Sequence, residues 1–263
     1  MSNDVEKYYN EFMHSRMLSY RIDGNRRLDA ASKFLSELLR PNMSIADIGC
    51  GIGIISERLG LANANNTVIG VDISSDNIEY ARRTVNASNV SFISASITEQ
   101  FSALKKTSNA PFDMIIMTDV IEHIPEEERS ALFHNLADVG VDGAILAVTY
   151  PSPEYQRYLV STHPEELQVI DNVVEIKTLI EEADAAGWML SRFSYVDVWQ
   201  KNQYCHAAFA RCLPLEKVVL SDTSAIRRPL AALTRKVVKA RRRRKYLTVP
   251  FRDWPSTPRN GNT

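Results

Sequence analysis

Short apolar runs and amphipathic stretches alternate along the first 150 residues of the chain. Apolar residues recur at helical spacing from Leu28 to Leu39, and Pro41 ends that stretch soon afterwards. Five apolar runs follow, each compatible with a buried strand, at residues 44–49, 67–72, 90–95, 112–117 and 144–150. Helical stretches lie between them, at residues 54–61, 75–85 and 125–137. Because parallel strands need long crossover connections, this alternation predicts an α/β fold with helices on both faces of a parallel sheet.

The regular alternation stops after Tyr150. Residues 151–172 are rich in proline and aromatic residues and predict an inserted loop or short helices beside the end of the fifth strand. A helix follows over residues 173–186. Two further apolar runs, 189–198 and 204–212, are separated by only a few residues, which favours an antiparallel hairpin. The chain therefore predicts a seven-stranded, mostly parallel sheet with an antiparallel C-terminal hairpin.

Charge is distributed unevenly between the body and the C-terminal tail. The chain has 31 Lys and Arg residues against 32 Asp and Glu residues, a formal net charge of −1. From Ser221 onward there are 12 basic and 2 acidic residues, which leaves 19 basic and 30 acidic residues before it. The tail thus carries +10 and the body −11. We expect three parts: a helical arm or lid at residues 1–27, a domain at 28–213 and a basic tail at 214–263.

The tail has a basic amphipathic segment. Residues 227–245 predict a helix after Pro229 with a narrow apolar stripe, formed by Leu230, Leu233, Val237 and Val238. Segments of this kind are attracted to anionic lipid headgroups. Nucleic acid attracts the same charge, although the arginine cluster lacks interleaved aromatic groups for base stacking. A solvated or intersubunit arm, an anionic membrane surface and, less favoured, a nucleic acid partner remain the alternatives.

Composition and cysteine usage limit the class of protein. With 44% hydrophobic and 24% charged residues, the chain is typical of a globular protein and not of a collagen-like or low-complexity one. No run approaches the roughly 18 apolar residues of a membrane-spanning helix, and the mixed-charge N-terminus shows no secretory signal. Three cysteines at unremarkable spacings support neither a disulfide framework nor a zinc site. We expect a cytoplasmic protein, with peripheral membrane association through the tail as an alternative.

A glycine-rich loop joins the first predicted strand to the next helix. It has the pattern Asp47-x-Gly49-x-Gly51-x-Gly53, with Cys50 in its middle. Glycines let the backbone approach a ligand closely, and the helix N-terminus behind them offers unpaired N–H groups. The third glycine of a dinucleotide-binding G-x-G-x-x-G pattern would fall at position 54, which is isoleucine. The loop alone is equally compatible with a plain tight turn.

The end of the second predicted strand indicates that the site binds a nucleoside. It ends at Asp72, where a carboxylate can accept hydrogen bonds from both hydroxyls of a ribose. Ile73 follows and can pack against an adenine face. An acidic residue at the end of the strand that follows a glycine loop favours a bound nucleoside over a plain turn.

Three segments in this order, Asp47–Gly53, Asp72 and FDMIIMTDVIEHIP at 112–125, resemble class I S-adenosylmethionine-dependent methyltransferases. The resemblance covers residues 28–212 and implies a Rossmann-like fold that binds S-adenosylmethionine. It implies that the glycine loop lines the methionine and ribose portion of the cofactor and that Asp72 holds the ribose hydroxyls.

The resemblance also assigns residues at the adenine and ammonium ends of the cofactor. The family usually has an acidic residue at position 96, where Ser96 offers a weaker, uncharged acceptor to the adenine amino group. Ile97 keeps the backbone contact to the ring. Asp119 occupies a position that often contacts the ammonium group of the cofactor.

The N-terminal arm carries a stripe of larger side chains at near-helical spacing: Tyr9, Phe12, Arg16 and Tyr20. Such a stripe is usually a core contact. Related methyltransferases, however, often fold a helix of this kind over the cofactor. In that arrangement Tyr9 and Arg16 contact the cofactor, and Tyr20 contacts the methyl acceptor.

Asp119, Glu122 and His123 are the candidates for the chemistry. On a helical turn their i, i+3, i+4 spacing lets them project in one direction, at the carboxyl end of a central strand. His123 can act as the general base for an alcohol acceptor. Alternatively, the three residues bind Mg²⁺ or Mn²⁺, since the segment resembles the E-x-x-E-H stretch of metal-binding quinone-pathway O-methyltransferases. As a third alternative, Glu122 and His123 only position the pocket wall.

On the acceptor side the candidates are aromatic residues and a histidine. Tyr150, Tyr155 and His163 lie at or after the fifth strand, and Trp199 lies in the predicted hairpin. Each can contact an acceptor or simply pack a lid.

Taken together, these observations favour an S-adenosylmethionine-dependent methyltransferase that acts on a small-molecule or sugar hydroxyl. The whole-chain pattern also resembles methyltransferases of polysaccharide and natural-product pathways, which favours a sugar-like acceptor. The alternatives are a nucleic-acid methyltransferase or binding protein recruited by the tail, and a non-catalytic cofactor-binding scaffold.

Overall fold

The computed structural model describes most of the region before the tail. The described residues are Tyr8, 18–98, Phe101, Leu104, 111–168, 170–211, Val237 and Ala240. The expected cofactor contacts Tyr9 and Arg16, and nearly all of the basic tail, therefore lie outside the described residues.

Contacts divide the chain into two units, Met1–Pro214 and Leu215–Thr263. In the second unit the two described residues, Val237 and Ala240, are helical and exposed. The first unit contains the sheet and the cavity described below. No helix in the described part of the chain has the length and apolar character needed to cross a membrane.

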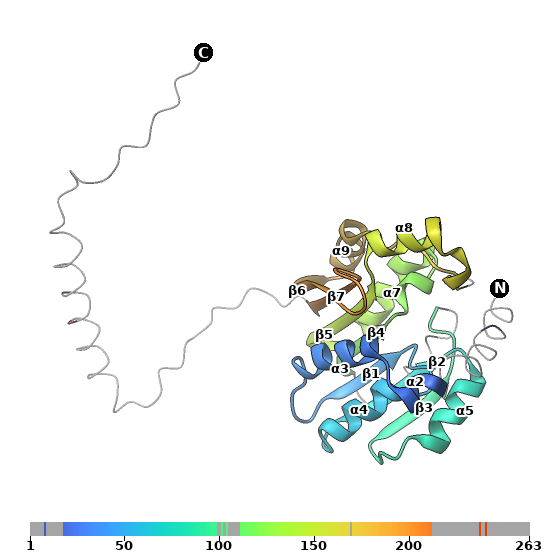
Figure 1. Cartoon of the computed structure of the whole chain (residues 1–263). Coiled ribbons are helices and arrows are strands. Elements are labelled where there is room, and N and C mark those ends of the chain that lie inside the picture. Colours follow the sequence, from blue (N-terminus) through green and yellow to red (C-terminus); the bar gives the residue numbers. More distant parts are fainter. Residues whose placement is uncertain are drawn as a thin grey trace. The chain divides into compact units, whose positions relative to one another are not determined.

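Seven strands form one sheet in the order β3-β2-β1-β4-β5-β7-β6 (Figure 1). The strands are β1 (Ser44–Ile48), β2 (Thr67–Asp72), β3 (Val90–Ser94), β4 (Phe112–Thr118), β5 (Gly140–Pro151), β6 (Trp188–Val196) and β7 (Tyr204–Arg211). The first five strands pair in parallel, and β7 runs antiparallel to both β5 and β6. The expected α/β fold with its antiparallel C-terminal hairpin is confirmed.

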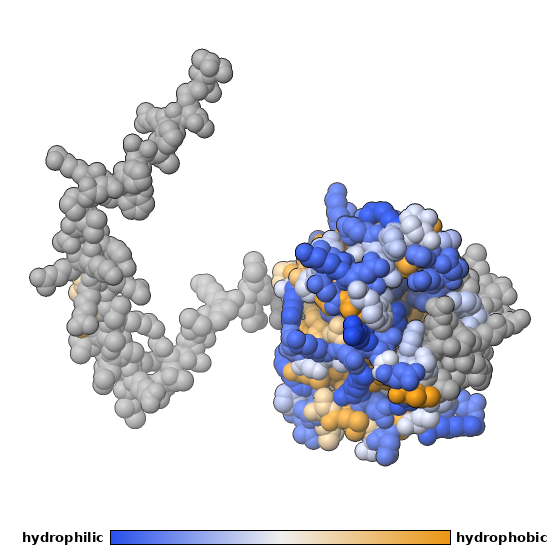
Figure 2. All heavy atoms as spheres, viewed as in Figure 1, coloured by the Kyte–Doolittle hydropathy of each residue, from blue (hydrophilic) through white to orange (hydrophobic). Residues whose placement is uncertain are grey.

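Helices cover both faces of this sheet (Figure 1). One face carries α3 (Arg26–Ser36), α4 (Ile54–Ala62) and α5 (Ser75–Thr84), and the other carries α7 (Glu126–Val139) and α9 (Ile176–Ala185). The remaining helical segments are α2 (Leu18–Asp23), η2 (Ile121–His123), α8 (Pro153–Thr162) and η3 (Pro164–Glu166). The expected domain boundary after residue 27 falls inside α3. The molecular face in Figure 2 is mostly hydrophilic with smaller apolar patches.

The side-chain alternation of β1 shows how the sheet builds two cores. Ile45 packs in one apolar cluster with Phe34 of α3 and Ile55 of α4. Ile48, three residues on and directed to the opposite face, packs in another cluster with Phe133 of α7. Because both faces are covered, the central strands are apolar throughout, which is why the sequence shows them as continuous apolar runs.

β5 is longer than its apolar pattern indicates. It begins at Gly140, four residues before the expected start at residue 144. Phe112 of β4 pairs with Gly140 while Met114 pairs with Ile145, so the register shifts between the two pairs. On the β5 side the irregularity contains Asp142 and Gly143, which has a φ of 76°. These residues interrupt the apolar run, so the pattern does not indicate the first part of the strand.

The Phe92 ring supports the glycine loop from within the sheet. A Cβ atom at Gly70 of β2 would lie 2.6 Å from Phe92 Cδ1 and 2.9 Å from Cys50 Sγ. A Cβ atom at Gly53 would lie 2.7 Å from Phe92 Cζ. The ring can approach both positions only because they are glycine, and it thereby fixes the loop between β1 and α4.

We expect Gly70→Ala to lower the free energy of unfolding by about 1–3 kcal/mol, because the added methyl group overpacks the site against Phe92. Urea unfolding of the single variants, Gly70→Ala and Phe92→Leu, and of the double variant measures the effect. The double variant should lose less than the sum of the single losses, since the smaller side chain makes room. Additive losses would show that the ring does not press on Gly70.

Candidate active site

A cavity of about 470 Å³ opens at the carboxyl ends of the central strands. Most of the candidate residues from the sequence line it: Tyr20, Asp47, Gly49, Cys50, Gly51, Asp72, Ile73, Ser96, Ile97, Asp119, Glu122, His123, Tyr155 and Trp199. Parallel strands bring their carboxyl ends to one edge of the sheet, so segments that are far apart in sequence meet there.

Three other candidates do not line the cavity. Tyr150 is fully buried in the core cluster on the α7 and α9 face, because its neighbour Thr149 takes the side of the strand that faces the site. Tyr150, which we expected to contact an acceptor, therefore does not line this cavity. Gly53 is the left-handed N-cap of α4 and lies against Phe92 instead. His163 caps the end of α8, with its Nδ1 3.2 Å from Glu165 Oε1.

The backbone of the glycine loop is tied to the neighbouring strand. The N–H groups of Gly49 and Cys50 both donate to the Val71 carbonyl oxygen, at 2.7 and 3.0 Å. Gly49 and Gly51 have φ values of 69° and 53°, a region that other residues seldom adopt. A Cβ atom at Gly49 would also lie 2.3 Å from Val120 Cγ2. The loop therefore presents bare backbone to the cavity.

The Asp72 carboxylate is held in place by three donors. Gly51 N donates to Oδ2 at 2.8 Å, while Ser74 N at 2.9 Å and Asn77 Nδ2 at 3.2 Å donate to Oδ1. Burial raises the pKa of Asp72, and the two backbone donors act in the opposite direction. Oδ1 already accepts two hydrogen bonds and Oδ2 only one, so a lone pair on Oδ2 is left to accept from a ligand hydroxyl.

Asp47 is a second buried carboxyl group, beneath the loop. Its Oδ2 accepts a hydrogen bond from Ser56 Oγ of α4 at 2.6 Å. Burial raises the pKa of Asp47 to about 7. The Ser56 hydrogen bond opposes this rise, and the Asp72 charge contributes to it. Two buried carboxyls at the same end of the cavity favour a ligand with positive charge.

The cavity also has an apolar part of its lining, to which Ile73 and Ile97 contribute, and Ser96 lines the same cavity. Ser96 is 8% exposed, and its Oγ lies 3.4 Å from Thr98 Oγ1. A flat aromatic group fits between such aliphatic side chains. An adenine nucleoside requires three features that this cavity combines: a glycine loop, a carboxylate acceptor and an apolar surface for the base.

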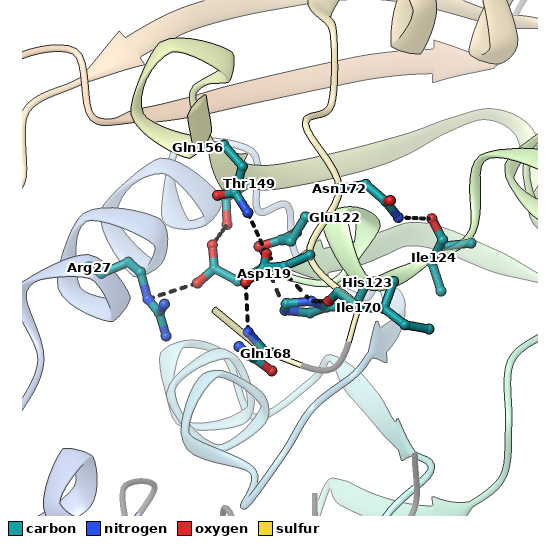
Figure 3. A network of polar contacts seen from close by, with 11 residues as sticks. Arg27, Asp119, Glu122, His123, Ile124, Thr149, Gln156, Gln168, Ile170 and Asn172 are labelled. Atoms are coloured by element: carbon teal, nitrogen blue, oxygen red, sulfur yellow. Dashed lines mark hydrogen bonds and ion pairs between the residues drawn. The ribbon is translucent and has the colours of Figure 1, made fainter. Parts of the chain in front are cut away.

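Asp119 forms an ion pair that the sequence did not indicate. Its Oδ2 lies 2.9 Å from Nε of Arg27, which comes from the first turn of α3, and Thr149 Oγ1 donates to its Oδ1 at 3.3 Å (Figure 3). Asp119 has φ of 56°, so the chain turns sharply after β4. Burial raises the pKa of Asp119, and the Arg27 guanidinium opposes that rise. The guanidinium carbon of Arg27 also lies 5.9 Å from the ring centroids of Tyr20 and Tyr204.

His123 is held by residues 170–172, a segment that we call the strap. Nδ1 of His123 lies 2.6 Å from the Ile170 carbonyl oxygen (Figure 3). Asn172 N donates to Glu122 O at 2.8 Å, and Asn172 Nδ2 donates to Ile124 O at 3.2 Å. The strap thus holds the imidazole and the backbone on both sides of it.

These contacts fix the protonation of the ring. A carbonyl oxygen can only accept, so the nitrogen that faces Ile170 carries the proton and Nε2 is the basic nitrogen of the neutral imidazole. Burial lowers the pKa of His123, against the opposing effect of Asp171. The ring is therefore neutral and able to accept a proton near neutral pH.

Glu122 is almost fully buried, with 2% of its surface exposed. Burial raises its pKa well above the usual range, and the charges of Asp119 and Asp171 add to this rise. Burial therefore favours the protonated carboxyl over the carboxylate at this position. Its Oε1 lies 4.0 Å from Nε2 of His123, beyond hydrogen-bond distance.

The expected metal site does not fit this arrangement. Among the described residues, Asp119, Glu122 and His123 do not offer ligand atoms within 4.8 Å of one another, whereas His163, Glu165 and Glu166 do. Asp119 is directed at Arg27, only residues 121–123 of the expected helical turn are helical, and His123 Nδ1 is engaged by Ile170. Asp119, Glu122 and His123 therefore line one cavity without forming a metal-binding set.

Several residues of the cavity wall were not found from the sequence: Arg27, Gln156, Gln168, Asp171 and Tyr204. Gln156 carried a signal, because it occupies the buried stripe of α8 together with Pro153 and Leu159. A polar residue at such a position needs a partner. The others lie in irregular segments or at strand and helix ends, where periodicity gives no information.

Comparison with known proteins identifies the domain. Residues 45–143 match a family model described as a methyltransferase domain. The chain is 33% identical over 85 residues to a ubiquinone biosynthesis O-methyltransferase from Colwellia psychrerythraea, covering 32% of this chain and 33% of that protein. It is 29% identical over 136 residues to the protein of the same description from Hydrogenovibrio crunogenus, covering 50% and 52%. The chain thus spans between a third and about half of the length of these curated relatives.

Solved structures share the fold over a larger part of the chain. The magnesium protoporphyrin IX methyltransferase of Synechocystis PCC 6803, solved with bound S-adenosylhomocysteine, has a TM-score of 0.61 and 18% identity. The match covers 80% of this chain and 99% of that chain. At this identity the similarity establishes the fold.

The buried Asp47 predicts a dependence of stability on pH in the free protein. An unfolded aspartate has a pKa of about 3.9, so between that value and about 7 the folded state binds the Asp47 proton more tightly. Protonated Asp47 therefore favours the folded state at low pH, and this stabilisation is lost as the pH rises through this window. From pH 5 to pH 8, the free energy of unfolding of Asp47→Asn minus that of the wild type should therefore increase by about 2–4 kcal/mol.

Urea unfolding of both proteins at the two pH values measures this difference, in which all other titrating groups cancel. Ser56→Ala removes the hydrogen bond that stabilises the charged carboxylate, so it should extend the pH window upward. An Asp47→Asn effect that is the same at both pH values would contradict the raised pKa.

Proposed function

We propose that the chain, a class I S-adenosylmethionine-dependent methyltransferase by its domain match and its fold, transfers the methyl group to a hydroxyl oxygen of a small molecule or sugar. The family resemblance drawn from the sequence is confirmed. The neutral, oriented imidazole of His123 beside the cofactor half of the cavity is the observation that carries the hydroxyl assignment.

The residues that would hold S-adenosylmethionine fit its chemical groups. Asp72 would accept from the ribose hydroxyls, and Ile73 and Ile97 would enclose the adenine. The backbone of Gly49 and Gly51, whose positive φ angles disfavour other residues, would lie along the ribose and methionine part. When bound, the cofactor supplies an electrophilic methyl group on a positively charged sulfur and a neutral thioether leaving group.

The protein's own contribution is alignment and removal of one proton. A hydroxyl oxygen that gains a methyl group must lose its proton, and Nε2 of His123 is the acceptor for it. Because the strap holds Nδ1–H on the Ile170 carbonyl, the imidazolium formed by this transfer remains hydrogen-bonded. The buried wall around His123 excludes water from the reacting groups.

Asp119 and Arg27 would set the orientation of the cofactor's amino-acid end. Arg27 fixes the Asp119 carboxylate through their ion pair, and the carboxylate lies in the cavity wall, where it can face an ammonium group. The pair is neutral as a unit, so it adds hydrogen-bonding groups to the cavity without adding net charge.

Replacement of Asp72 by Asn should weaken cofactor binding. An amide can still accept at one atom, but it lacks the negative charge that strengthens such bonds, and its NH₂ group would face the donor Gly51 N or Ser74 N. We expect the Kd for S-adenosylhomocysteine to rise about tenfold or more, measured by calorimetry. Glu79→Gln, on the exposed side of α5, is the control and should leave the Kd unchanged. An unaltered Kd in Asp72→Asn would remove the ribose assignment.

Replacement of His123 by Ala should separate binding from turnover. S-adenosylhomocysteine should bind with an affinity close to that of the wild type, while methyl transfer should fall by about 10²–10⁴-fold. His134→Ala is a matched control, because that imidazole also meets a backbone carbonyl but lies exposed on α7. Since the pKa of His123 is lowered, activity of the wild type should decline only at pH values below the usual pKa of histidine. Full turnover in His123→Ala would refute the role as base.

A further inference from the structure

Residues from η2, α8 and the segment after η3 bring to the cavity wall polar oxygens that have no hydrogen-bond partner among the described residues. Glu122, Gln156 and Gln168 all line the cavity. One oxygen of each, Glu122 Oε2, Gln156 Oε1 and Gln168 Oε1, is buried and makes no hydrogen bond among the described residues. Glu122 and Gln156 are only 2% and 1% exposed. Buried oxygens of this kind are normally satisfied, so three in one wall indicate groups that a ligand would engage.

The orientation of the Gln156 amide is determined by its neighbour. Its Nε2 donates to Asp171 Oδ1 at 2.6 Å, and Gln168 N donates to Asp171 Oδ2 at 3.0 Å (Figure 3). A carboxylate accepts only, so the amide cannot be turned round without placing two oxygens together. Gln156 must therefore present its oxygen as the unmatched atom, and that oxygen needs a donor.

Glu122 adds a group that both donates and accepts. Its Oε2 has no hydrogen-bond partner among the described residues, and in the protonated form that burial favours the carboxyl has one O–H and one carbonyl oxygen, which match a hydroxyl group. With the two amide oxygens, the wall therefore requires at least two donors and suits several hydroxyl groups on one ligand.

Aromatic rings form another part of the same cavity. Tyr155 and Tyr204 have ring centroids 6.3 Å apart, and Trp199, at the turn between β6 and β7, lies 54% exposed at the cavity. Aromatic faces offer an apolar platform for the C–H face of a ring-shaped ligand. A cavity with a platform and a hydroxyl-binding wall matches a saturated ring that has an apolar face and a polar edge.

We propose that the methyl acceptor is a pyranose sugar or a closely similar polyhydroxylated ring, whose hydroxyl groups bind Glu122, Gln156 and Gln168. This inference rests on the proposed function and specifies its substrate. One hydroxyl of the ring is presented to His123, and the others occupy the wall. In this arrangement Gln156 and Gln168 determine specificity and take no part in proton transfer.

Two other acceptor classes fit the wall less well. A lipophilic phenol has too few hydroxyls to meet the amide oxygens, and each that remains unpaired weakens binding. An acidic acceptor would meet Glu128, Glu166 and Asp171 in the same cavity, whereas Arg27, its only lysine or arginine among the described residues, is already paired with Asp119. The wall therefore favours an uncharged polyol over both.

The test uses the full chain saturated with S-adenosylhomocysteine. Calorimetry measures binding of a panel of neutral methyl pyranosides that differ in single hydroxyl configurations, and of an alkyl catechol as the lipophilic phenol. Mass spectrometry with S-adenosylmethionine then detects the methylated product. We expect at least one pyranoside to bind and to be methylated, and the catechol to bind more weakly.

Gln168→Leu is the most direct variant, because Asp171 is bonded to the backbone N–H of residue 168 and that bond survives the change. Its pyranoside Kd should rise about tenfold or more, with the Kd for S-adenosylhomocysteine unchanged. Gln156→Leu should act in the same direction. Gln200→Leu is the matched control, since its exposed side chain does not line the cavity, and it should have no effect.

The possible failures are distinguishable. If S-adenosylhomocysteine binds and the catechol is methylated while no pyranoside binds, the sugar inference is overturned and methyl transfer stands. If pyranoside binding is unaffected in Gln168→Leu and Gln156→Leu, the proposed wall is overturned. If the wild type does not bind S-adenosylhomocysteine, the proposed function is overturned together with this inference.

Discussion

The hydrogen bonds between the glycine loop and the end of β2 determine the geometry of the cofactor half of the site. Gly49 N and Cys50 N donate to Val71 O, and Gly51 N donates to the Asp72 carboxylate at 2.8 Å. The loop can make these bonds only with the positive φ angles that glycine permits. In return, the Gly51 N–H fixes one oxygen of the Asp72 carboxylate in the cavity wall. Backbone conformation and ligand-binding chemistry therefore depend on each other at this point.

Buried charge is the second constraint on the cavity. Asp47, Asp72 and Glu122 are buried and the Asp119 side chain is largely covered, and desolvation raises the pKa of each of the four. Arg27 compensates one of these carboxyls, through its ion pair with Asp119. The free protein therefore loses stability at this site, and a ligand that brings a sulfonium and an ammonium group relieves part of that cost. Binding of the cofactor and stability of the domain should be strongly coupled.

Pattern analysis predicted the fold, and it selected glycine-loop residues that the structure brings together with Asp72 in one cavity, for physical reasons. Buried parallel strands produce continuous apolar runs, and the loop residues Gly49 and Gly51 need an unusual backbone, so both leave signals in the sequence. Tyr150 was expected near the acceptor but lies in the core, because the alternation of side chains along β5 puts its neighbour Thr149 on the side of the site. The Arg27–Asp119 ion pair joins residues 92 positions apart, and no local pattern encodes such a contact.

The two halves of the cavity also differ in what similarity to other proteins can say about them. The family match covers residues 45–143 and so includes the glycine loop, Asp72 and His123. Gln156, Gln168 and the strap all follow that range. They are positioned by α8 and by the chain between α8 and α9, which the family match does not cover. The acceptor must therefore be argued from the donors and acceptors of this wall, where the unpaired oxygens of Gln156 and Gln168 require a ligand rich in hydroxyl groups.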